Sequence, residues 1–119
     1  MKKLILLLLF VPLVLGCSSF KSGLTIPANQ TFILGESNSK NYSAELVNTS
    51  NYEVKIRVEK KQNGEYTQGF GLAPKGKVTV NVSSDEIIKF INNNNLPVKV
   101  NVKMNKEVYG MRYIKNWNE

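Results

Sequence analysis

The chain contains no histidine and a single cysteine among its 119 residues. Histidine is the commonest general base and zinc ligand, and a Ser–His or Cys–His nucleophile pair cannot form without it. One cysteine cannot close an internal disulfide. No glycine-rich stretch has the spacing of a phosphate-binding loop. We therefore expect no catalytic residue, no cofactor and no metal ion, and we predict that the protein is not an enzyme.

One catalytic alternative needs neither histidine nor cysteine. A pair of carboxylates in a cleft hydrolyses glycosides in many enzymes. The chain offers weak candidates for such a pair, because Glu45, Glu53 and Glu59 fall at polar positions of predicted strands. Asp85 and Glu86 fit the start of a helix instead.

A hydrophobic run long enough to span a bilayer is also absent. The N-terminal apolar run Leu4–Leu15 is shorter than the roughly 18 residues that a span requires. Lys2 and Lys3 precede this run and Gly16 ends it, which is the layout of a secretory signal peptide. The sole cysteine, Cys17, follows where such a signal is cleaved. We predict that residues 1–16 are a signal peptide.

The motif Val14-Leu15-Gly16-Cys17 resembles the lipobox of bacterial lipoproteins. The resemblance implies that Cys17 receives a diacylglyceryl group, with palmitate-type acyl chains, and that the chain is cut before it. Leu15 departs from the pattern, since a smaller residue is commoner there. Two or more acyl chains suffice for stable membrane attachment. An ordinary secretory signal with a coincidental cysteine is the alternative.

The resemblance also bears on location. In Gram-negative members of the family, Asp after the cysteine is the usual signal for retention in the inner membrane, and here the residue is Ser18. The lipoprotein hypothesis therefore implies the outer membrane in a Gram-negative cell. In a Gram-positive cell it implies the outer face of the cell membrane.

The mature protein has one small domain and an excess of positive charge. Of 119 residues, 103 remain after the 16-residue signal is removed, and the 16 basic residues lose Lys2 and Lys3. Fourteen basic against nine acidic residues give a formal charge of +5. This charge favours lipid headgroups, anionic glycans or acidic proteins as partners, whereas an exported protein rarely meets nucleic acid. A charge that serves only solubility is the alternative.

Short segments of alternating polar and apolar residues fill most of the mature chain, as is typical of antiparallel β-structure. In residues 53–60, Val54, Ile56 and Val58 alternate with charged side chains. We predict strands at residues 31–34, 41–48, 53–60, 65–72, 77–82, 97–104 and 107–114. Asn63-Gly64 favours a tight hairpin, and the short link Asn105-Lys106 predicts a hairpin between the last two strands.

One segment breaks the alternation. In residues 83–95, Ser83 stands three residues before Glu86, which resembles a helix capping box. Ile87, Ile88 and Ile91 then fall on one side of a helix, and the asparagines at 92–95 end it. We predict a short helix between strands here.

These elements predict an all-β fold, an antiparallel β-sandwich with one short helix between strands. Residues 72–82, LAPKGKVTVNV, resemble a turn-and-strand pattern of immunoglobulin-like modules of bacterial surface proteins. The resemblance implies an immunoglobulin-like sandwich, although the Cys…Trp…Cys spacing of true immunoglobulin domains is missing. We expect residues 17–23 to be the acylated cysteine and a tether, and residues 24–119 to be a single domain.

Two groups of side chains are candidates for a binding surface. The first alternates with buried residues and forms one basic face if the strands share a sheet: Lys55, Arg57, Lys77, Lys99 and Lys103. A solvated surface that discourages edge pairing is the alternative. The second comprises aromatic residues: Tyr66, Phe70, Tyr109, Tyr113 and Trp117. We expect Phe70, Tyr109 and Tyr113 to fill the core and Trp117 to be exposed or docked on the sandwich.

These observations favour a non-catalytic, lipid-anchored envelope lipoprotein that acts as a binding or accessory module for an anionic ligand or surface. One alternative is an inhibitor or immunity lipoprotein that blocks a secreted enzyme or toxin. A positive domain would steer towards an acidic target rather than a basic one. Another alternative is a subunit of an envelope assembly that pairs through its sheet edges.

Overall fold

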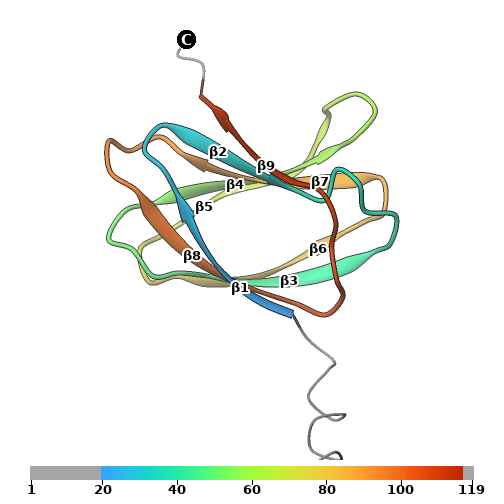
Figure 1. The fold of residues 1–119 in the computed structure, drawn as a ribbon, viewed down its shortest axis with the longest axis horizontal. Helices are drawn as coiled ribbons and strands as arrows, with labels where there is room; N and C mark the ends of the chain where they lie inside the picture. The colour runs from blue at the N-terminus through green and yellow to red at the C-terminus, as the bar shows by residue number, and fades with distance from the viewer. Residues whose placement is uncertain (1–19, 117–119) are drawn as a thin grey trace, which may run out of the picture.

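The computed structural model describes residues 20–116, which form two antiparallel β-sheets and no helix (Figure 1). This part of the chain therefore contains no helix that could cross a membrane. The strands are β1 (Phe20–Ile26), β2 (Gln30–Leu34), β3 (Tyr42–Asn48), β4 (Val54–Lys60), β5 (Tyr66–Leu72), β6 (Lys77–Val82), β7 (Glu86–Asn92), β8 (Val98–Met104) and β9 (Met111–Lys115). The predicted antiparallel β-sandwich is confirmed.

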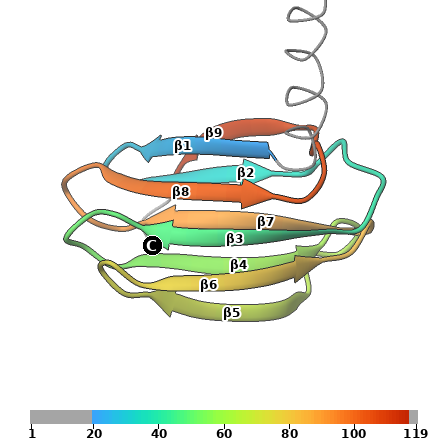
Figure 2. The same ribbon diagram turned by 90° about the horizontal axis from the view of Figure 1, so that it is seen from below.

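The strand order is that of a jelly roll. One sheet has the order β1-β8-β3-β6 and the other β5-β4-β7-β2-β9, and Figure 2 shows them lying face to face. Without β9, the order is that of two interleaved Greek keys in eight strands. The immunoglobulin order keeps the first two strands side by side in one sheet, so the resemblance at residues 72–82 does not extend to the topology. A turn followed by an alternating strand occurs in every sandwich, whereas strand order depends on long-range pairing.

The connections gather at the two ends of the sandwich because almost every one of them crosses from one sheet to the other. The entry end, where β1 begins, consists of residues 35–41, 61–65, 83–85 and 105–110. The far end consists of residues 27–29, 49–53, 73–76 and 93–97. The exception is the β4–β5 hairpin at the entry end, which confirms the tight turn predicted at Asn63-Gly64.

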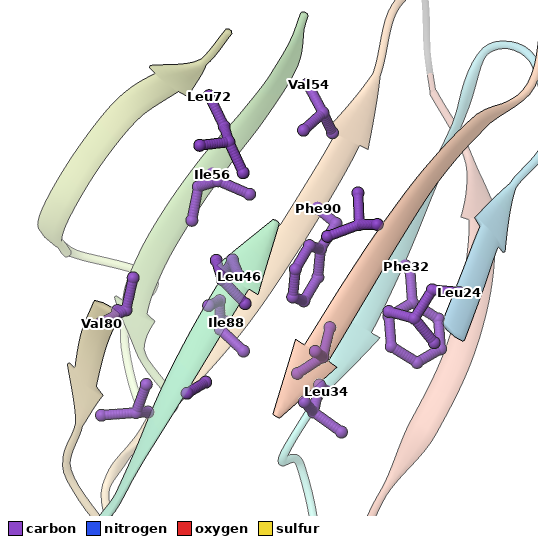
Figure 3. Packing of buried hydrophobic residues seen from close by; sticks show 14 of the residues in the cluster. Leu24, Phe32, Leu34, Leu46, Val54, Ile56, Leu72, Val80, Ile88 and Phe90 are labelled. Atoms are coloured by element: carbon purple, nitrogen blue, oxygen red, sulfur yellow. The ribbon is translucent and has the colours of Figure 1, made fainter. Parts of the chain in front are cut away.

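Apolar side chains from both sheets fill the interior (Figure 3). The alternation predicted for β4 is confirmed, because Val54, Ile56 and Val58 are fully buried. The rings of Phe32 and Phe90 pack at a centroid distance of 5.9 Å in the same layer. Since the interior is occupied by these side chains, binding sites must lie on the outer faces or at the two ends.

The predicted helix at residues 83–95 is wrong, because Glu86–Asn92 forms β7, a central strand between β4 and β2. Only one of the two capping-box contacts is present, and the segment closes a turn. The backbone N–H of Ser83 donates to the Glu86 carboxylate at 2.9 Å, and the Glu86 N–H donates to the Ser83 carbonyl at 3.0 Å. β7 carries Ile87 and Ile91 on its outer face and Ile88 and Phe90 on its inner face, so its sequence lacks the period of two that marks a half-exposed strand.

The predicted hairpin across Asn105-Lys106 is also wrong. β8 pairs with β1 and β3, whereas β9 pairs with β2 in the other sheet. The predicted tether is too long at its C-terminal end, because β1 already begins at Phe20 and pairs with β8 from there. A short link shows that two strands follow one another in the chain but not that they share a sheet.

The three aromatic residues that were predicted to fill the core do not do so. Tyr109 and Tyr113 are exposed, and Phe70 is half-buried against the core. The Tyr113 hydroxyl donates to the Thr25 carbonyl of β1 at 3.0 Å and so bridges the two sheets at their rim. β9 is an edge strand, so its inward side chains cover only this rim.

Candidate binding groove on the five-stranded sheet

The outer face of the five-stranded sheet is hollowed into a groove of about 540 Å³. The pairing register of the strands determines which charged residues lie in this groove. On β4, Lys55 and Arg57 point outward, because their neighbours Val54, Ile56 and Val58 belong to the core. Arg57 lies opposite Lys89 of β7, and Lys55 lies opposite Ile91. Basic side chains from two adjacent strands therefore meet at one end of the groove.

A largely buried ion pair forms part of the groove floor. The Lys89 ammonium lies 3.1 Å from the Glu59 carboxylate, and the two side chains are 25% and 8% exposed. Ile33, in the neighbouring strand β2, is only 1% exposed although it faces away from the core cluster. This outer face therefore has a small apolar layer of its own beneath the charged side chains.

Residues 35–41, at the entry end, do not line the groove but are tied to the same sheet. Both guanidinium nitrogens Nε and Nη2 of Arg112 donate to the Glu36 carboxylate, at 2.7 and 2.9 Å. These hydrogen bonds hold the pKa of Glu36 below its usual value. The Lys61 ammonium donates to the Asn38 carbonyl and ties the same loop to the end of β4. These contacts tie residues 35–41 to the edge strand β9 and to the end of β4.

The wall of the groove nearest the far end is built from side-chain amides. The Asn116 side-chain amide donates to the Asn92 carbonyl and to the Asn93 side-chain oxygen, both at 2.9 Å. The Thr31 hydroxyl donates to the Asn116 side-chain oxygen. Thr31 lies between Ile91 and the neighbouring Ile114 in one row of the sheet. The groove thus has an apolar floor between a cationic end and an amide wall.

Tyr66 lies against Arg57 at the cationic end. The Arg57 guanidinium carbon is 4.6 Å from the centre of the Tyr66 ring, and its Nη1 donates to the tyrosine hydroxyl. A register shift between Val58 and Glu59 aligns Tyr66 with Glu59 and leaves Thr67 without a partner. Such a β-bulge turns the following side chains to the other face. Without it, Tyr66 would share the inward face of Phe70.

Glycines of the edge strand β5 flank Arg57 and Lys55. Gly69 and Gly71 of the edge strand β5 lie opposite Arg57 and Lys55. A second hollow of about 390 Å³ lies here, with the Glu53 carboxylate near Gly71. No atom lies within 4 Å of the position that a Cβ on Gly69 would occupy. Arg57 is therefore also accessible from this side, whereas the Glu53 carboxylate occupies the space beside Gly71, opposite Lys55.

Positive charge dominates the groove. Lys55, Arg57, Lys89 and Lys115 line it with one carboxylate, that of Glu59, which is already paired with Lys89. Lys55, Arg57 and Lys115 form no ion pair with any carboxylate of residues 20–116. Within that range, no group of three or more acidic or cysteine side chains could hold a metal ion. The arrangement is suited to bind an anion.

The five basic residues proposed from the sequence divide between the two sheets. Lys55 and Arg57 lie in the groove, whereas Lys77, Lys99 and Lys103 lie on the outer face of the four-stranded sheet. They therefore do not make one stripe. Cys17 and Trp117, the predicted lipid-attachment site and exposed aromatic residue, lie outside the described residues.

Sequence reasoning missed two cations of the groove. Lys89 was hidden because its segment was predicted to be a helix, and Lys115 follows the predicted end of the last strand. The neighbours Ile88 and Phe90 are both apolar, but Ile87 and Ile91 on the same face as Lys89 are apolar too, so alternation did not mark Lys89 as an outward residue. The alternative of an unbroken strand at 86–92 would have placed it beside Arg57 only once the pairing with β4 was known.

The sequence matches no protein-family model and no curated protein. Solved structures that share the fold include the following two. Peruvianin-I, a cysteine peptidase from Thevetia peruviana latex, matches with a TM-score of 0.57 and 9% identity over 84% of this chain and 58% of its own. Procruciferin, an 11S globulin from Brassica napus, matches with a TM-score of 0.53 and 11% identity over 88% and 24%. The chain spans less than two thirds of either protein, and such low identities show the fold alone.

Proposed function

We propose that the protein is a non-catalytic, lipid-anchored lipoprotein of the bacterial cell envelope that binds an anionic glycan in the groove of the five-stranded sheet. The observation that carries the proposal is the charge balance of the groove. Four cations and one carboxylate line it, and the carboxylate is paired with Lys89. The lipobox resemblance at Cys17 supports the anchor.

The chemistry of the groove favours a glycan among anionic ligands. Arg57 is held by the Tyr66 ring and hydroxyl, which leaves its remaining guanidinium donors for an oxyanion. The exposed tyrosine ring and the side chain of Ile91 suit the apolar faces of sugar rings. The amides of Asn93 and Asn116 can exchange hydrogen bonds with hydroxyl groups.

The electrostatic part of this binding depends on salt. Exposed charges separated by more than about 8 Å are screened at physiological ionic strength. Lys55 and Arg57 stand one pleat repeat apart, about 7 Å along β4, so both act on the same stretch of ligand. Affinity should therefore fall steeply as salt rises.

The test is binding of the purified protein to polygalacturonate, with neutral dextran as the comparison polymer. The variant Lys55→Gln/Arg57→Gln should lose roughly tenfold or more in affinity, since hydrogen bonds to charged groups contribute about 1.5–3 kcal/mol each. The matched control, Lys99→Gln/Lys103→Gln, removes the same charge from the other sheet and should change affinity less than about twofold. Equal losses in both variants would mean that net charge, and not the groove, attracts the polymer.

A second pair of variants tests the groove without changing any charge. Gly69→Leu adds a side chain in the open space beside Arg57 and should weaken binding to polygalacturonate. The matched control is Gly23→Leu on the outer face of the four-stranded sheet, where a Cβ meets only the Asn101 side chain at 3.5 Å. Weak polymer binding combined with tight binding of one acidic protein would favour the inhibitor alternative instead.

A further inference from the structure

Exposed aromatic side chains gather at the entry end of the sandwich. Phe20, the first residue of β1, is 38% exposed, and Tyr109 is 55% exposed. Together with Lys40 and Lys106 they line a hollow of about 370 Å³. An aromatic ring beside a lysine is the combination that proteins place at the boundary between lipid and water.

The backbone around Tyr109 is held firmly. Gly35 donates to the Gly110 carbonyl at 2.7 Å, and Ser37 donates to the Tyr109 carbonyl at 3.3 Å. Gly110 has φ of +90°, and a Cβ there would lie 2.5 Å from the Ser37 nitrogen. Only glycine permits this close approach, so residues 35–41 and 105–110 form one surface.

The chain leads from this surface directly to Cys17. Three peptide bonds link Cys17 to Phe20, so the distance between their Cα atoms is at most about 11 Å. We propose that the entry end is a docking surface for the bilayer, in which Phe20 and Tyr109 enter the headgroup region while Lys40 and Lys106 contact phosphate groups. The proposal rests on the acylation of Cys17 that forms part of the proposed function.

Docking at the entry end stands the strands upright on the membrane. β4 ends at this surface with Lys60, and Lys55 lies five residues away, about 17 Å along the strand. The binding groove, on the outer face of the five-stranded sheet, then stands above the membrane surface and opens sideways, parallel to the membrane plane. A glycan bound there would pass within roughly 30 Å of the headgroups.

The experiment uses the acylated protein in nanodiscs of phosphatidylcholine and phosphatidylglycerol that contain a spin-labelled lipid. Paramagnetic broadening of backbone amide signals reports which residues approach the lipid. We expect strong broadening at Phe20, Lys40 and Tyr109 and little at Lys75 of the far end. The variant Phe20→Ser/Tyr109→Ser should reduce the entry-end broadening at least roughly twofold, because it removes the apolar area that enters the bilayer.

The matched control removes exposed apolar side chains from the far end. Tyr52 and Leu96 are 40% and 50% exposed there, and Tyr52→Ser/Leu96→Ser should leave the broadening unchanged. Uniform broadening in the wild type, or no change in Phe20→Ser/Tyr109→Ser, would overturn the docking surface. Mass spectrometry of Cys17 tests the anchor separately: an unacylated cysteine would overturn both proposals, whereas an acylated protein without entry-end broadening would overturn only this one.

Discussion

The two outer faces of the sandwich use similar strands but differ in what covers them. On the four-stranded sheet, Glu45 lies opposite Lys103 and forms an exposed ion pair with Lys77 at 3.2 Å. On the five-stranded sheet, Glu59 is buried against Lys89. An outward carboxylate thus pairs with lysine on both faces, but only one pair is shielded from water.

The difference comes from connections and not from the strands. Residues 35–41 are joined to the five-stranded sheet at Arg112 and to Lys61 beside it, and Asn93 and Asn116 close one end of the groove. The outer face of the four-stranded sheet has a shallower hollow of about 370 Å³ beside Glu45 and Lys103. Cations gain binding strength where neighbouring groups restrict water, so a similar density of lysine has different consequences on the two faces.

The largest expected difference between the faces concerns apolar side chains. Ile33 is buried on the outer face of the five-stranded sheet, whereas Val47 is half-buried on that of the four-stranded sheet. Ile33→Ala should lower the free energy of unfolding by about 2–4 kcal/mol, because it leaves a cavity at a fully buried site. Val47→Ala should cost less than about 1 kcal/mol. Urea unfolding measures both, and equal losses would show that the burial of Ile33 adds no stability to this face.

The two carboxylates give the next difference. Glu59→Gln leaves the Lys89 ammonium largely out of water without a counter-charge, and should cost about 2 kcal/mol of stability. This figure is below that of a fully buried pair because Lys89 remains one-quarter exposed. Glu45→Gln should cost less than about 0.5 kcal/mol. If thermal or urea unfolding finds the two variants alike, the burial of Glu59 has no energetic consequence.

A smaller effect is expected from Tyr66, which orients Arg57. Tyr66→Ala should weaken binding to polygalacturonate roughly three- to fivefold, since an exposed cation–π contact contributes about 0.5–1 kcal/mol. Tyr66→Phe keeps the ring and should lose no more than about twofold. Tyr52→Ala, which removes an exposed tyrosine of the far end, serves as the control. Unaltered affinity in Tyr66→Ala would mean that Arg57 does not need the ring.

The smallest effect concerns Tyr42, which lies between the sheets and belongs to neither outer face. Its buried hydroxyl has no hydrogen-bond partner among the described residues. Burial, and then the negative charge of Glu86, raise the pKa of Tyr42 above its ordinary value. The folded state therefore keeps the proton that the unfolded chain releases above about pH 10.

This shift has a definite sign. Stability from Tyr42 is complete below about pH 10 and is lost as pH rises, by up to about 1.4 kcal/mol per pH unit. Tyr42→Phe should remove this alkaline loss and change stability at neutral pH by no more than about 1 kcal/mol. Denaturant unfolding at neutral and alkaline pH checks it, with Tyr52→Phe expected to retain the wild-type slope.

Much of the fold could be predicted from local patterns. In β4, β6 and β8 the period of two identified the strands and their inward residues, because side chains of a strand alternate whatever its neighbours are. β7 escaped because it is covered on both faces, and β1 because Phe20–Ile26 has only two buried positions near its end. Alternation of polar and apolar residues identifies a strand only where one face of the strand is exposed to solvent and the other is buried.

The candidate site was predictable only in part. Lys55 and Arg57 could be assigned to an outward face from their alternation with Val54, Ile56 and Val58. The same reasoning placed Lys99 and Lys103 outward, and correctly, but could not show that their strand belongs to the other sheet. Period two specifies a side of a strand, while strand pairing specifies which surface that side becomes.

The residue sequence alone thus determined that the chain is built of strands, which side chains of most strands point inward, and where a motif that resembles a lipobox lies. Tertiary structure decided the jelly-roll order, the meeting of Lys89 with Arg57, and the outward turn of Tyr66 at the β-bulge. The physical reason is range. Alternation and turn chemistry act between neighbours in the chain, whereas sheet order and register arise from contacts between strands that are distant in sequence.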